Sequence, residues 1–397
     1  MLIYDEALAR ILAQVKPLPA EEIRLEDARG LVLGENIISP IPLPPFANSS
    51  MDGFAVRTVD VQHPPVTLPI AGDIPAGTLS IPILRPGTVL RIMTGAPVPD
   101  GADAVIPVEE TKAQASGAVT FLTRTIAGDC IRFAGEDVAA GSIVLPAGTR
   151  LRPAGIGLCA AVGRTAVRAV PRPRVAIIST GDELVPPGQV LQPGQIYNSN
   201  LYSLAAQVEE AGGIVTQRLS SRDTPESLRE VFDQCAGADL LLTSGGVSVG
   251  DYDYVKAVFA ERGTIDFWRV AIRPGKPLAF GHWDSTLFFG LPGNPMSSLV
   301  TFELFVRPAL RRLLGYSDTA RPLIRARLTE DAVHNPGRQS FLRAVAAKIP
   351  GGHTVRPLSR QGSGMLGTVA EANALLIIPS EVSVLPLGTE AQVLLLD

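Results

Sequence analysis

Apolar residues are spaced differently in successive parts of this chain of 397 residues. In the first 17 residues, apolar side chains share one face of a helix, which predicts an amphipathic helix. They are Ala7, Leu8, Ile11, Leu12 and Val15. Between residues 39 and 148, Pro and Gly recur every few positions between short β-rich runs. That pattern predicts a small antiparallel domain with many turns.

The middle of the chain, from residue 174 to 315, alternates between strand and helix patterns. The predicted strands are 174–180, 213–219, 239–246, 265–272 and 285–290, and the predicted helices are 200–213, 224–235, 253–263 and a long one after residue 293. Thr224 and Asn294 are expected to cap helices at their N-termini, and Gly212 is expected to end one. Such alternation predicts a mostly parallel sheet with helices on both faces.

These patterns predict a multidomain protein of the α/β and β classes. A central doubly wound α/β domain is expected, with a β-rich N-terminal domain and a small C-terminal β-domain. The expected domains are a discontinuous helical and linking domain (1–51 plus 137–170), a β-rich inserted domain (52–136), the α/β domain (171–317) and the C-terminal β-domain (318–397). The length fits about two to four domains.

Composition narrows the functional classes. Apolar residues make up 46% of the chain and the formal net charge is −4, so bulk charge gives no reason to expect binding to nucleic acid or to an acidic membrane. The first residues lack the basic start and apolar core of a signal peptide, and no apolar run reaches membrane-spanning length. The three scattered cysteines argue against a disulfide framework. We therefore expect a soluble cytoplasmic protein.

Three of the predicted parallel strands end in glycine-rich or polar turns. These turns contain Gly181, Asp182 and Glu183; Gly245, Gly246, Ser248, Gly250, Asp251 and Asp253; and Gly290, Pro292, Gly293, Asn294, Pro295 and Ser297. Ligands bind at the carboxyl ends of strands in open parallel sheets, and free amides at helix starts hold phosphate. We expect Glu183 and Asp253 to hold Mg²⁺ beside that phosphate, because Mg²⁺ prefers carboxylate and phosphate oxygens. Taken alone, the acids of "DYDY" fit helix capping at least as well.

A basic segment, "FWRVAIRPGKPLAF", brings three cations together in sequence. On one strand, Arg269 and Arg273 would point to the same face, with Lys276 following in the turn. This predicts a cationic site for an oxyanion, although "RPGKP" alone also fits a solvated turn. In the N-terminal half, Asp52 and Asp137 fit ordinary turn acids when each is taken alone.

Other familiar sites lack support in the sequence. "GIGLCA" at 155–160 matches a dinucleotide-binding pattern, but no strand precedes it. The chain has no P-loop motif, and its four histidines are scattered, so neither a zinc site nor a histidine-based triad is indicated.

Eight motifs in one order give the chain a specific resemblance. They are "SSMDGFAVR", "RIMTGAPVPDGADAVI", "GEDVAAG", "STGDEL", "SGGVSVGDYDYVK", "RPGKPLAFG", "LPGNPMSS" and "GSGML…ANALLIIP". Together they closely resemble the molybdopterin molybdenumtransferases, the MoeA and gephyrin E-domain family. The resemblance implies an enzyme that inserts molybdate into adenylylated molybdopterin, releases AMP and needs Mg²⁺ or a similar ion. It also implies four-domain homodimers whose active cleft draws on both subunits.

The resemblance also implies roles for single residues. It places Asp52, Thr94, Asp137, Glu183, Asp223 and Asp253 at the active cleft, and Pro292 and Pro295 in a strand-end turn. Arg269 and Arg273 stand where many members have lysine, which keeps the charge but changes its geometry. A transient contact with the preceding adenylyltransferase is expected. Two alternatives stay open: a paralogue that handles tungstate, and a scaffold of the gephyrin type.

Overall fold

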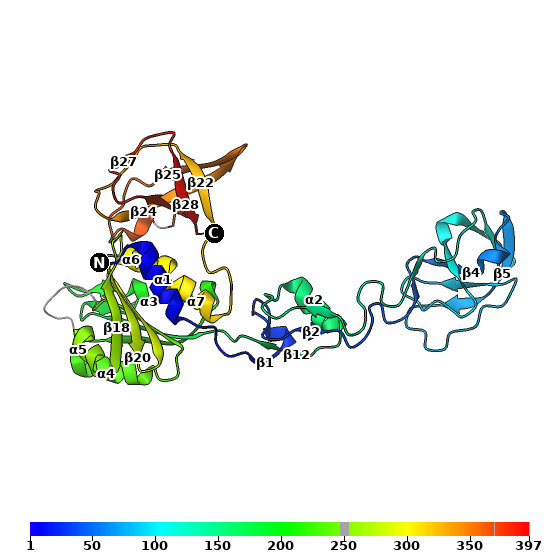
Figure 1. The fold of residues 1–397 in the computed structure, drawn as a ribbon, viewed down its shortest axis with the longest axis horizontal. Helices are drawn as coiled ribbons and strands as arrows, with labels where there is room; N and C mark the ends of the chain where they lie inside the picture. Colours follow the sequence, from blue (N-terminus) through cyan, green and yellow to red (C-terminus); the bar gives the residue numbers. More distant parts are fainter. Residues whose placement is uncertain (247–253, 369, 397) are drawn as a thin grey trace. The chain divides into compact units, whose positions relative to one another are not determined.

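The computed structural model describes residues 1–246, 254–368 and 370–396. Within this range the chain forms two compact units. The first joins Met1–Ile23 and Gly30–Gly34 to the chain from Arg168 to the C-terminus, and the second joins Arg24–Arg29 to Glu35–Val167. Figure 1 shows the elements of both units, coloured along the sequence.

A six-stranded sheet forms the middle of the first unit, and it confirms the predicted α/β fold class. Its order is β16 (Ile214–Ser221), β13 (Arg174–Thr180), β17 (Leu240–Ser244), β21 (Thr286–Leu291), β20 (Pro277–Trp283) and β18 (Gly263–Arg269). The first four strands pair in parallel, and β20 and β18 add antiparallel pairs at one edge. The sheet is therefore mostly parallel, and its parallel strands all end at the same edge.

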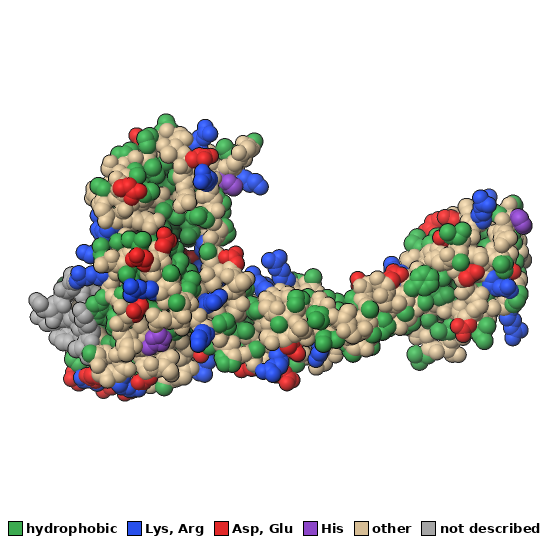
Figure 2. Space-filling model, viewed as in Figure 1, with side chains coloured by type: hydrophobic (Ala, Val, Ile, Leu, Met, Phe, Trp, Pro, Cys, Tyr) green, Lys and Arg blue, Asp and Glu red, His purple; other side chains and the backbone are tan. Residues whose placement is uncertain are grey.

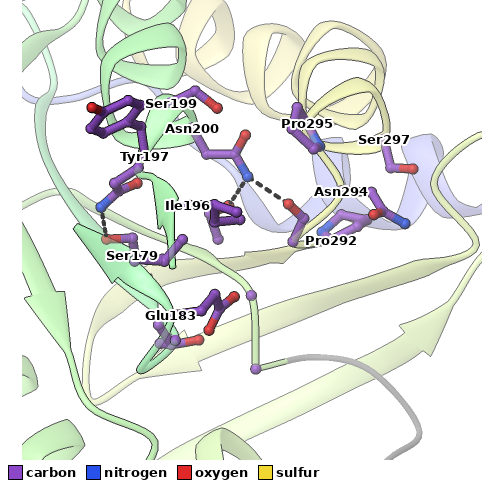
Figure 3. A pocket seen from close by; sticks show the side chains of 18 of the residues that line it. Ser179, Glu183, Ile196, Tyr197, Ser199, Asn200, Pro292, Asn294, Pro295 and Ser297 are labelled. Atoms are coloured by element: carbon purple, nitrogen blue, oxygen red, sulfur yellow. Dashed lines mark hydrogen bonds between the residues drawn. The ribbon is translucent and has the colours of Figure 1, made fainter. Parts of the chain in front are cut away.

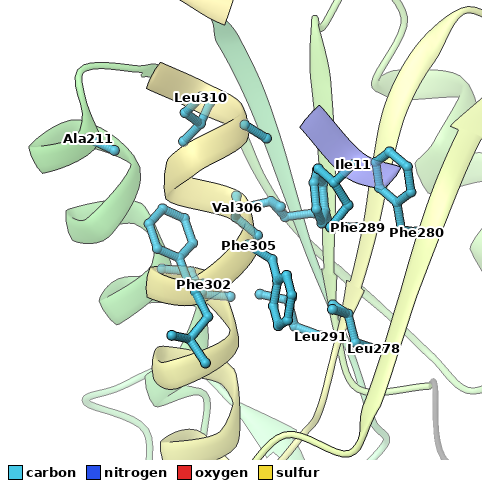
Figure 4. Close-up of a cluster of buried hydrophobic side chains, with 14 of the residues drawn as sticks. Ile11, Ala211, Leu278, Phe280, Phe289, Leu291, Phe302, Phe305, Val306 and Leu310 are labelled. Carbon is cyan, nitrogen blue, oxygen red and sulfur yellow. The ribbon is translucent and has the colours of Figure 1, made fainter. Parts of the chain in front are cut away.

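Helices cover both faces of this sheet because the buried strands are apolar on both sides. One face packs against α1 (Tyr4–Gln14), α3 (Ser199–Ala211), α6 (Pro295–Thr301), a π-helical turn η4 (Phe302–Val306) and α7 (Arg307–Leu313). The other face packs against α4 (Pro225–Gln234) and α5 (Tyr254–Arg262). Within β13, Ile177 faces the first cluster and Ile178 the second, as the two-residue period of a strand requires. Figure 4 shows part of the first cluster, in which Phe305 of η4 lies beside Leu291 of the sheet.

The predicted helix ends are only partly confirmed. Thr224 caps α4, since its side chain accepts a hydrogen bond from the Ser227 amide, and Gly212 ends α3 in the left-handed conformation with φ of 99°. Asn294 stands at the N-cap position of α6, but its side chain makes no capping bond. The long helix expected after residue 293 is interrupted by the π-helical turn.

A second six-stranded sheet completes the first unit. Its order is β19 (Ile272–Arg273), β24 (Gln339–Ile349), β25 (Gly352–Pro357), β22 (Leu323–Leu328), β28 (Glu390–Leu395) and β26 (Ala374–Ile378). This sheet confirms the small C-terminal β-rich part. Its first strand, β19, comes from the α/β segment of the sequence, so the two sheets are tied together by the chain between residues 269 and 272.

The second unit is β-rich, as predicted. Its main sheet has the order β7 (Ala104–Pro107), β4 (Gly53–Val56), β6 (Val89–Ile92), β5 (Val66–Ile74), β9 (Ala118–Phe121) and β8 (Thr111–Ala113). All pairs are antiparallel except β5 with β6, so the expectation of a purely antiparallel domain is wrong at that pair. The short pairs β3 (Asn48–Ser49) with β10 (Ile131–Arg132) and β2 (Ile37–Ile38) with β11 (Ile143–Leu145) lie outside this sheet, as does α2 (Pro153–Ala161).

The first helix belongs with the α/β part of the chain. We expected residues 1–51 to join 137–170, but Ala7 and Ile11 of α1 are fully buried in the core beneath the central sheet. In Figure 1, α1 lies beside α7. The apolar face of α1 explains this placement, because a helix buries that face against a hydrophobic core. The remaining domain boundaries stay predictions.

Two further observations concern the charged surface and the length of the helices. Figure 2 shows cationic and anionic side chains interspersed over the visible face of the described residues. Among the helices that the structure describes, none combines the length and apolar character needed to cross a membrane.

Candidate active site

A cavity of about 550 Å³ lies at the carboxyl ends of three parallel strands. Its wall includes the ends of β13 and β17, the turn after β21 and the start of α3, and Figure 3 shows it from close by. Nine predicted site residues line it: Glu183, Asp223, Gly245, Gly246, Pro292, Gly293, Asn294, Pro295 and Ser297. The size lies in the range of about 300–1,000 Å³ that small-molecule sites occupy.

Two glycines let the turn after β17 approach β13. Gly245 and Gly246 have φ of 94° and 67°, which side chains other than glycine rarely adopt. A Cβ on Gly245 would stand 2.7 Å from the carbonyl oxygen of Thr180, and one on Gly246 would stand 2.5 Å from Cγ2 of Val255. Only glycine therefore fits here, and the backbone forms this wall of the cavity.

Asparagine side chains tie the strand ends together. Nδ2 of Asn200 donates to Oγ of Ser244 and to the carbonyl oxygen of Gly293, at 2.8 Å each. One residue at the start of α3 thus joins the end of β17 to the turn after β21, as Figure 3 shows. Nearby, Nδ2 of Asn198 donates to Oγ of Ser179 at 2.6 Å, and its Oδ1 accepts from the Leu201 amide as the N-cap of α3.

Carboxylates gather at one side of the cavity. The carboxylate of Glu183 folds back over Gly181, where a Cβ would stand 2.5 Å from its Oε2. Burial raises the pKa of Asp223, and the nearby negative charges of Asp182 and Glu183 raise it further. Since desolvation and like charges both oppose ionisation, a cation placed among these groups would relieve the repulsion.

The chemistry of these donors suits Mg²⁺, which takes oxygen ligands and completes its shell with water and phosphate. Among the residues that the structure describes, no three acidic, histidine or cysteine side chains are arranged to hold a metal by themselves. A Mg²⁺ ion at this site would take phosphate oxygens of a substrate as further ligands. That is the usual pattern for magnesium at phosphate sites.

The basic segment differs from its prediction. Arg269 and Arg273 do not share one strand: β18 ends at Arg269, and Arg273 belongs to β19 in the C-terminal sheet. Arg269 and Lys276 line a separate hollow with Arg10 and Asp266. The two-residue period failed because the chain leaves the central sheet after residue 269.

Arg273 instead lies within the C-terminal sheet, on its first strand β19. Burial and the positive charge of Arg273 together lower the pKa of Arg338, so the two guanidinium groups lie near each other. The turn that follows packs on α6, because a Cβ on Gly275 would stand 2.3 Å from Cγ2 of Thr301 and 3.6 Å from the carbonyl oxygen of Ser297. Pro277 and Ser297 both line the main cavity, which places this turn at the cavity's edge.

The first amides of α6 are not all free, contrary to expectation. The Met296 amide donates to the carbonyl oxygen of Ser363 at 3.0 Å, so a loop of the C-terminal part covers this end of the helix. The Met296 amide is therefore not available to a phosphate without rearrangement.

In the second unit, two predicted residues meet. Oδ1 of Asp52 accepts from both the amide and Oγ1 of Thr94, at 2.7 Å each, although the two are 42 positions apart. These bonds from Thr94, with a smaller contribution from Arg91, lower the pKa of Asp52, so it is ionised at neutral pH. Asp137 is exposed in a turn, where its amide donates to the carbonyl oxygen of Leu43. Ser248, Gly250 and Asp253 lie outside the described residues.

Several polar residues of the cavity were missed. They are Ser179, Thr180, Asn198, Ser199, Asn200 and Ser244. A signal was present in "YNSN", because an asparagine directly before a predicted helix is a common cap. The nearness of Arg338 to Arg273 had no local signal, because Arg338 stands just before β24, far along the chain from Arg273.

Three family models match the chain in order. The model for the MoeA N-terminal region (domain I and II) matches residues 2–163, and the one for a probable molybdopterin-binding domain matches residues 176–312. The model for the MoeA C-terminal region (domain IV) matches residues 325–396. All the residues that line the cavity lie within the segment matched by the second model.

Relatives of known name match almost the whole chain. Molybdopterin molybdenumtransferase 2 of Mycobacterium tuberculosis is 42% identical over 98% of both chains, and the molybdopterin molybdenumtransferase of Haemophilus influenzae is 37% identical over 96% of this chain and 95% of its own. A solved structure of the molybdopterin biosynthesis MoeA protein from Pyrococcus horikoshii is 33% identical, with a TM-score of 0.83 over 100% of this chain and 99% of that one. The chain is a transferase of molybdenum cofactor biosynthesis and belongs to the molybdopterin molybdenumtransferase family.

Proposed function

We propose that this transferase inserts molybdate into adenylylated molybdopterin in a Mg²⁺-dependent reaction that releases AMP. The observation that carries the proposal is the cavity at the strand ends, where backbone turns, carboxylates and a nearby basic turn meet. The backbone turns and carboxylates suit a substrate with phosphates, and the basic turn suits a molybdate dianion. The names of the relatives support membership in the family. The adenylylated substrate and the Mg²⁺ dependence are part of our proposal, and the assay below tests them.

The phosphates of the substrate are assigned to the backbone turns. Gly245, Gly246 and Gly293 leave the backbone accessible in the cavity wall, and Pro292, Asn294 and Pro295 continue it. Asn200 holds the turn after β17 and the turn after β21 at a fixed spacing. Ser248 and Gly250 belong to the same proposal from the sequence.

The proposed Mg²⁺ would be held by Glu183 and Asp253, directly or through water. When bound, the ion neutralises phosphate charge and favours departure of AMP. Asp223 is partly buried beside Glu183, and its raised pKa reflects the negative charge that a cation would balance. We assign Asp223 to the same acidic group.

Molybdate is assigned to the basic turn at the cavity edge. Arg273 and Lys276 flank this turn and would supply charge, and Ser297 would supply a hydroxyl group. Arg269 is assigned to the same anion, although Arg269 and Lys276 also line the separate hollow. Arg338 adds a cation beside Arg273, because its Nη1 donates to the carbonyl oxygen of Ile272 in β19, and an anion bound there would offset the repulsion between the two guanidinium groups. A dianion needs several such donors to replace its hydration.

Asp52, Thr94 and Asp137 are proposed to act in the same reaction. The bond between Asp52 and Thr94 supports this, because an ionised and oriented carboxylate is more than a turn requires. The homodimer and the transient contact with the adenylyltransferase stay predictions. Light scattering of the purified protein tests the first of these, with the mass of two chains expected.

The test is a turnover assay with purified protein and adenylylated molybdopterin. AMP release should require both molybdate and Mg²⁺, and chelation of the metal should stop it reversibly. Tungstate in place of molybdate tests oxyanion preference. AMP release that is unaffected by omission of either molybdate or the metal would contradict the proposal.

A further inference from the structure

Two aliphatic residues, Leu184 and Ile196, line the wall of the candidate active site, and 54% of the surface of Ile196 is accessible to solvent. They belong to the short strands β14 (Leu184–Val185) and β15 (Ile196–Tyr197), which pair in parallel. Leu184 lies directly opposite Ile196 in that pair, so the two side chains leave the same face of it. We call these two residues the aliphatic wall.

Hydrogen bonds on both sides of Ile196 hold the aliphatic wall in place. The Ile196 amide donates to the carbonyl oxygen of Glu183 at 2.9 Å. The next residue, Tyr197, is tied through its hydroxyl group, which donates to the carbonyl oxygen of Gln189 at 2.8 Å. Asn198 follows as the N-cap of α3. Ile196 is therefore anchored on the acidic side of the cavity, beside Glu183.

An exposed aliphatic side chain inside a cavity differs from one on the open surface. Single exposed apolar residues are ordinary on protein surfaces, whereas apolar walls of small-molecule cavities contact the apolar parts of a ligand. Figure 3 shows Ile196 among the polar side chains that line the cavity. The phosphates, metal ion and oxyanion of the proposed reaction are all charged, and none of them gains from contact with an aliphatic group. The largest apolar surfaces of the proposed substrate are the faces of its planar rings.

We propose that the aliphatic wall binds a planar nitrogen heterocycle of the substrate, with one face of the ring against Ile196. The inference rests on the proposed function, because it takes adenylylated molybdopterin as the substrate. That molecule carries two such heterocycles, the adenine and the pterin, and both offer a flat face to an aliphatic side chain. Because Ile196 is bonded to Glu183, the ring would lie on the acidic side of the cavity.

The first test measures binding of adenylylated molybdopterin by equilibrium dialysis, without molybdate or Mg²⁺, so that binding is separated from turnover. In Ile196→Ala the Kd should rise about fivefold, because a ligand can cover the exposed part of the isoleucine side chain but finds little of it in alanine. Ile196→Val, which removes only one methyl group, should fall between Ile196→Ala and the wild-type protein. An unchanged Kd in Ile196→Ala would overturn the proposal.

Ile214→Ala is the matched control. Ile214 is 47% exposed and opens β16 of the central sheet, but it does not line the cavity. Both substitutions remove the same atoms from a half-exposed side chain, so the free energies of unfolding should fall by similar amounts. Only Ile196→Ala should weaken binding of adenylylated molybdopterin. An equal rise of Kd in the two variants would show a general effect and overturn the proposal.

Three simpler probes identify which ring the aliphatic wall takes. AMP and ribose 5-phosphate share the sugar phosphate, but only AMP carries adenine, and 6-hydroxymethylpterin carries the pterin alone. If the ring is adenine, Ile196→Ala should weaken AMP binding and leave ribose 5-phosphate binding unchanged. If it is the pterin, Ile196→Ala should weaken binding of 6-hydroxymethylpterin. An equal loss for AMP and ribose 5-phosphate, with the pterin unaffected, would assign the effect to the phosphate and overturn the proposal.

The same measurements separate this inference from the proposed function. If the wild-type protein binds adenylylated molybdopterin but releases no AMP when molybdate and Mg²⁺ are added, the proposed function fails, while the aliphatic wall is still judged by the Kd values. If the wild-type protein does not bind adenylylated molybdopterin, AMP and 6-hydroxymethylpterin decide. A wild-type protein that binds none of these three ligands would overturn the aliphatic wall as well.

Discussion

Removal of the Asn200 side-chain amide should weaken substrate binding as well as the fold. Asn200→Ala deletes two hydrogen bonds of 2.8 Å, to Ser244 and to the carbonyl oxygen of Gly293. At about 0.5–1.5 kcal/mol for each bond, the loss amounts to about 1–3 kcal/mol. If all of it appears in transition-state binding, kcat/KM falls by about fivefold to about 150-fold, at about 1.4 kcal/mol for each factor of ten.

The assay measures AMP release over a range of adenylylated molybdopterin concentrations, together with denaturant unfolding of the same protein. Asn373→Ala is the matched control. The side-chain amide of Asn373 also makes two hydrogen bonds, at 2.8 and 3.0 Å to the backbone of Ala346, but these lie in the C-terminal sheet. Both variants should lose similar stability. Only Asn200→Ala should lose kcat/KM, and equal kinetic losses in the two variants would refute the reasoning.

Four further predictions follow from the site. Glu183→Gln should raise the Mg²⁺ concentration needed for AMP release, or stop that release, with little change in the thermal midpoint, since Glu183 is exposed; a normal Mg²⁺ titration would reject it as a metal ligand. Arg273→Ala should raise the half-saturating molybdate concentration more than the KM of the adenylylated pterin, and equal rises would assign Arg273 to the phosphates. Asp52→Asn should keep the fold, because an amide oxygen still accepts from Thr94, yet lose turnover; full activity would leave Asp52 a turn residue. Asp223→Asn should raise the thermal midpoint at neutral pH, with a gain that shrinks as the pH falls toward 3.8, and a gain independent of pH would contradict the raised pKa.

The sign of that last prediction follows from proton binding. The pKa of Asp223 is higher in the folded protein than its usual 3.8. Between these two values the folded state binds more protons than the unfolded state, so stability falls as the pH rises through this window. At neutral pH the full cost of the charged carboxylate is present, and asparagine removes it.

The central fold could be predicted from the sequence because local patterns specify it. Buried strands such as 174–180 and capped helices such as the one after Thr224 are read from periodicity and capping within a few residues. Their alternation then leaves a parallel sheet as the only simple arrangement. Six of the nine cavity residues followed from the same reasoning, since parallel strands end at one edge, and the other three, Asp223, Pro292 and Pro295, were named only through the family resemblance.

What the sequence did not predict depends on contacts between distant segments. The placement of Arg273 was wrong because β19 pairs with β24, which starts at Gln339, and periodicity carries no information about such a partner. The bond between Ser363 and Met296 and the nearness of Arg338 to Arg273 have the same origin. Asp52 and Thr94 could be named only through the resemblance, since turn chemistry gives no reason to pair residues 42 positions apart.

Transfer of molybdenum in step with AMP release tests the central claim most directly. Purified protein would be given adenylylated molybdopterin, Mg²⁺ and isotope-labelled molybdate, and both AMP and pterin-bound molybdenum would be measured over time. The account predicts that one molybdenum atom joins the pterin for each AMP released, and that neither product forms without molybdate. AMP release without molybdenum on the pterin would show a hydrolase in place of a molybdenumtransferase reaction.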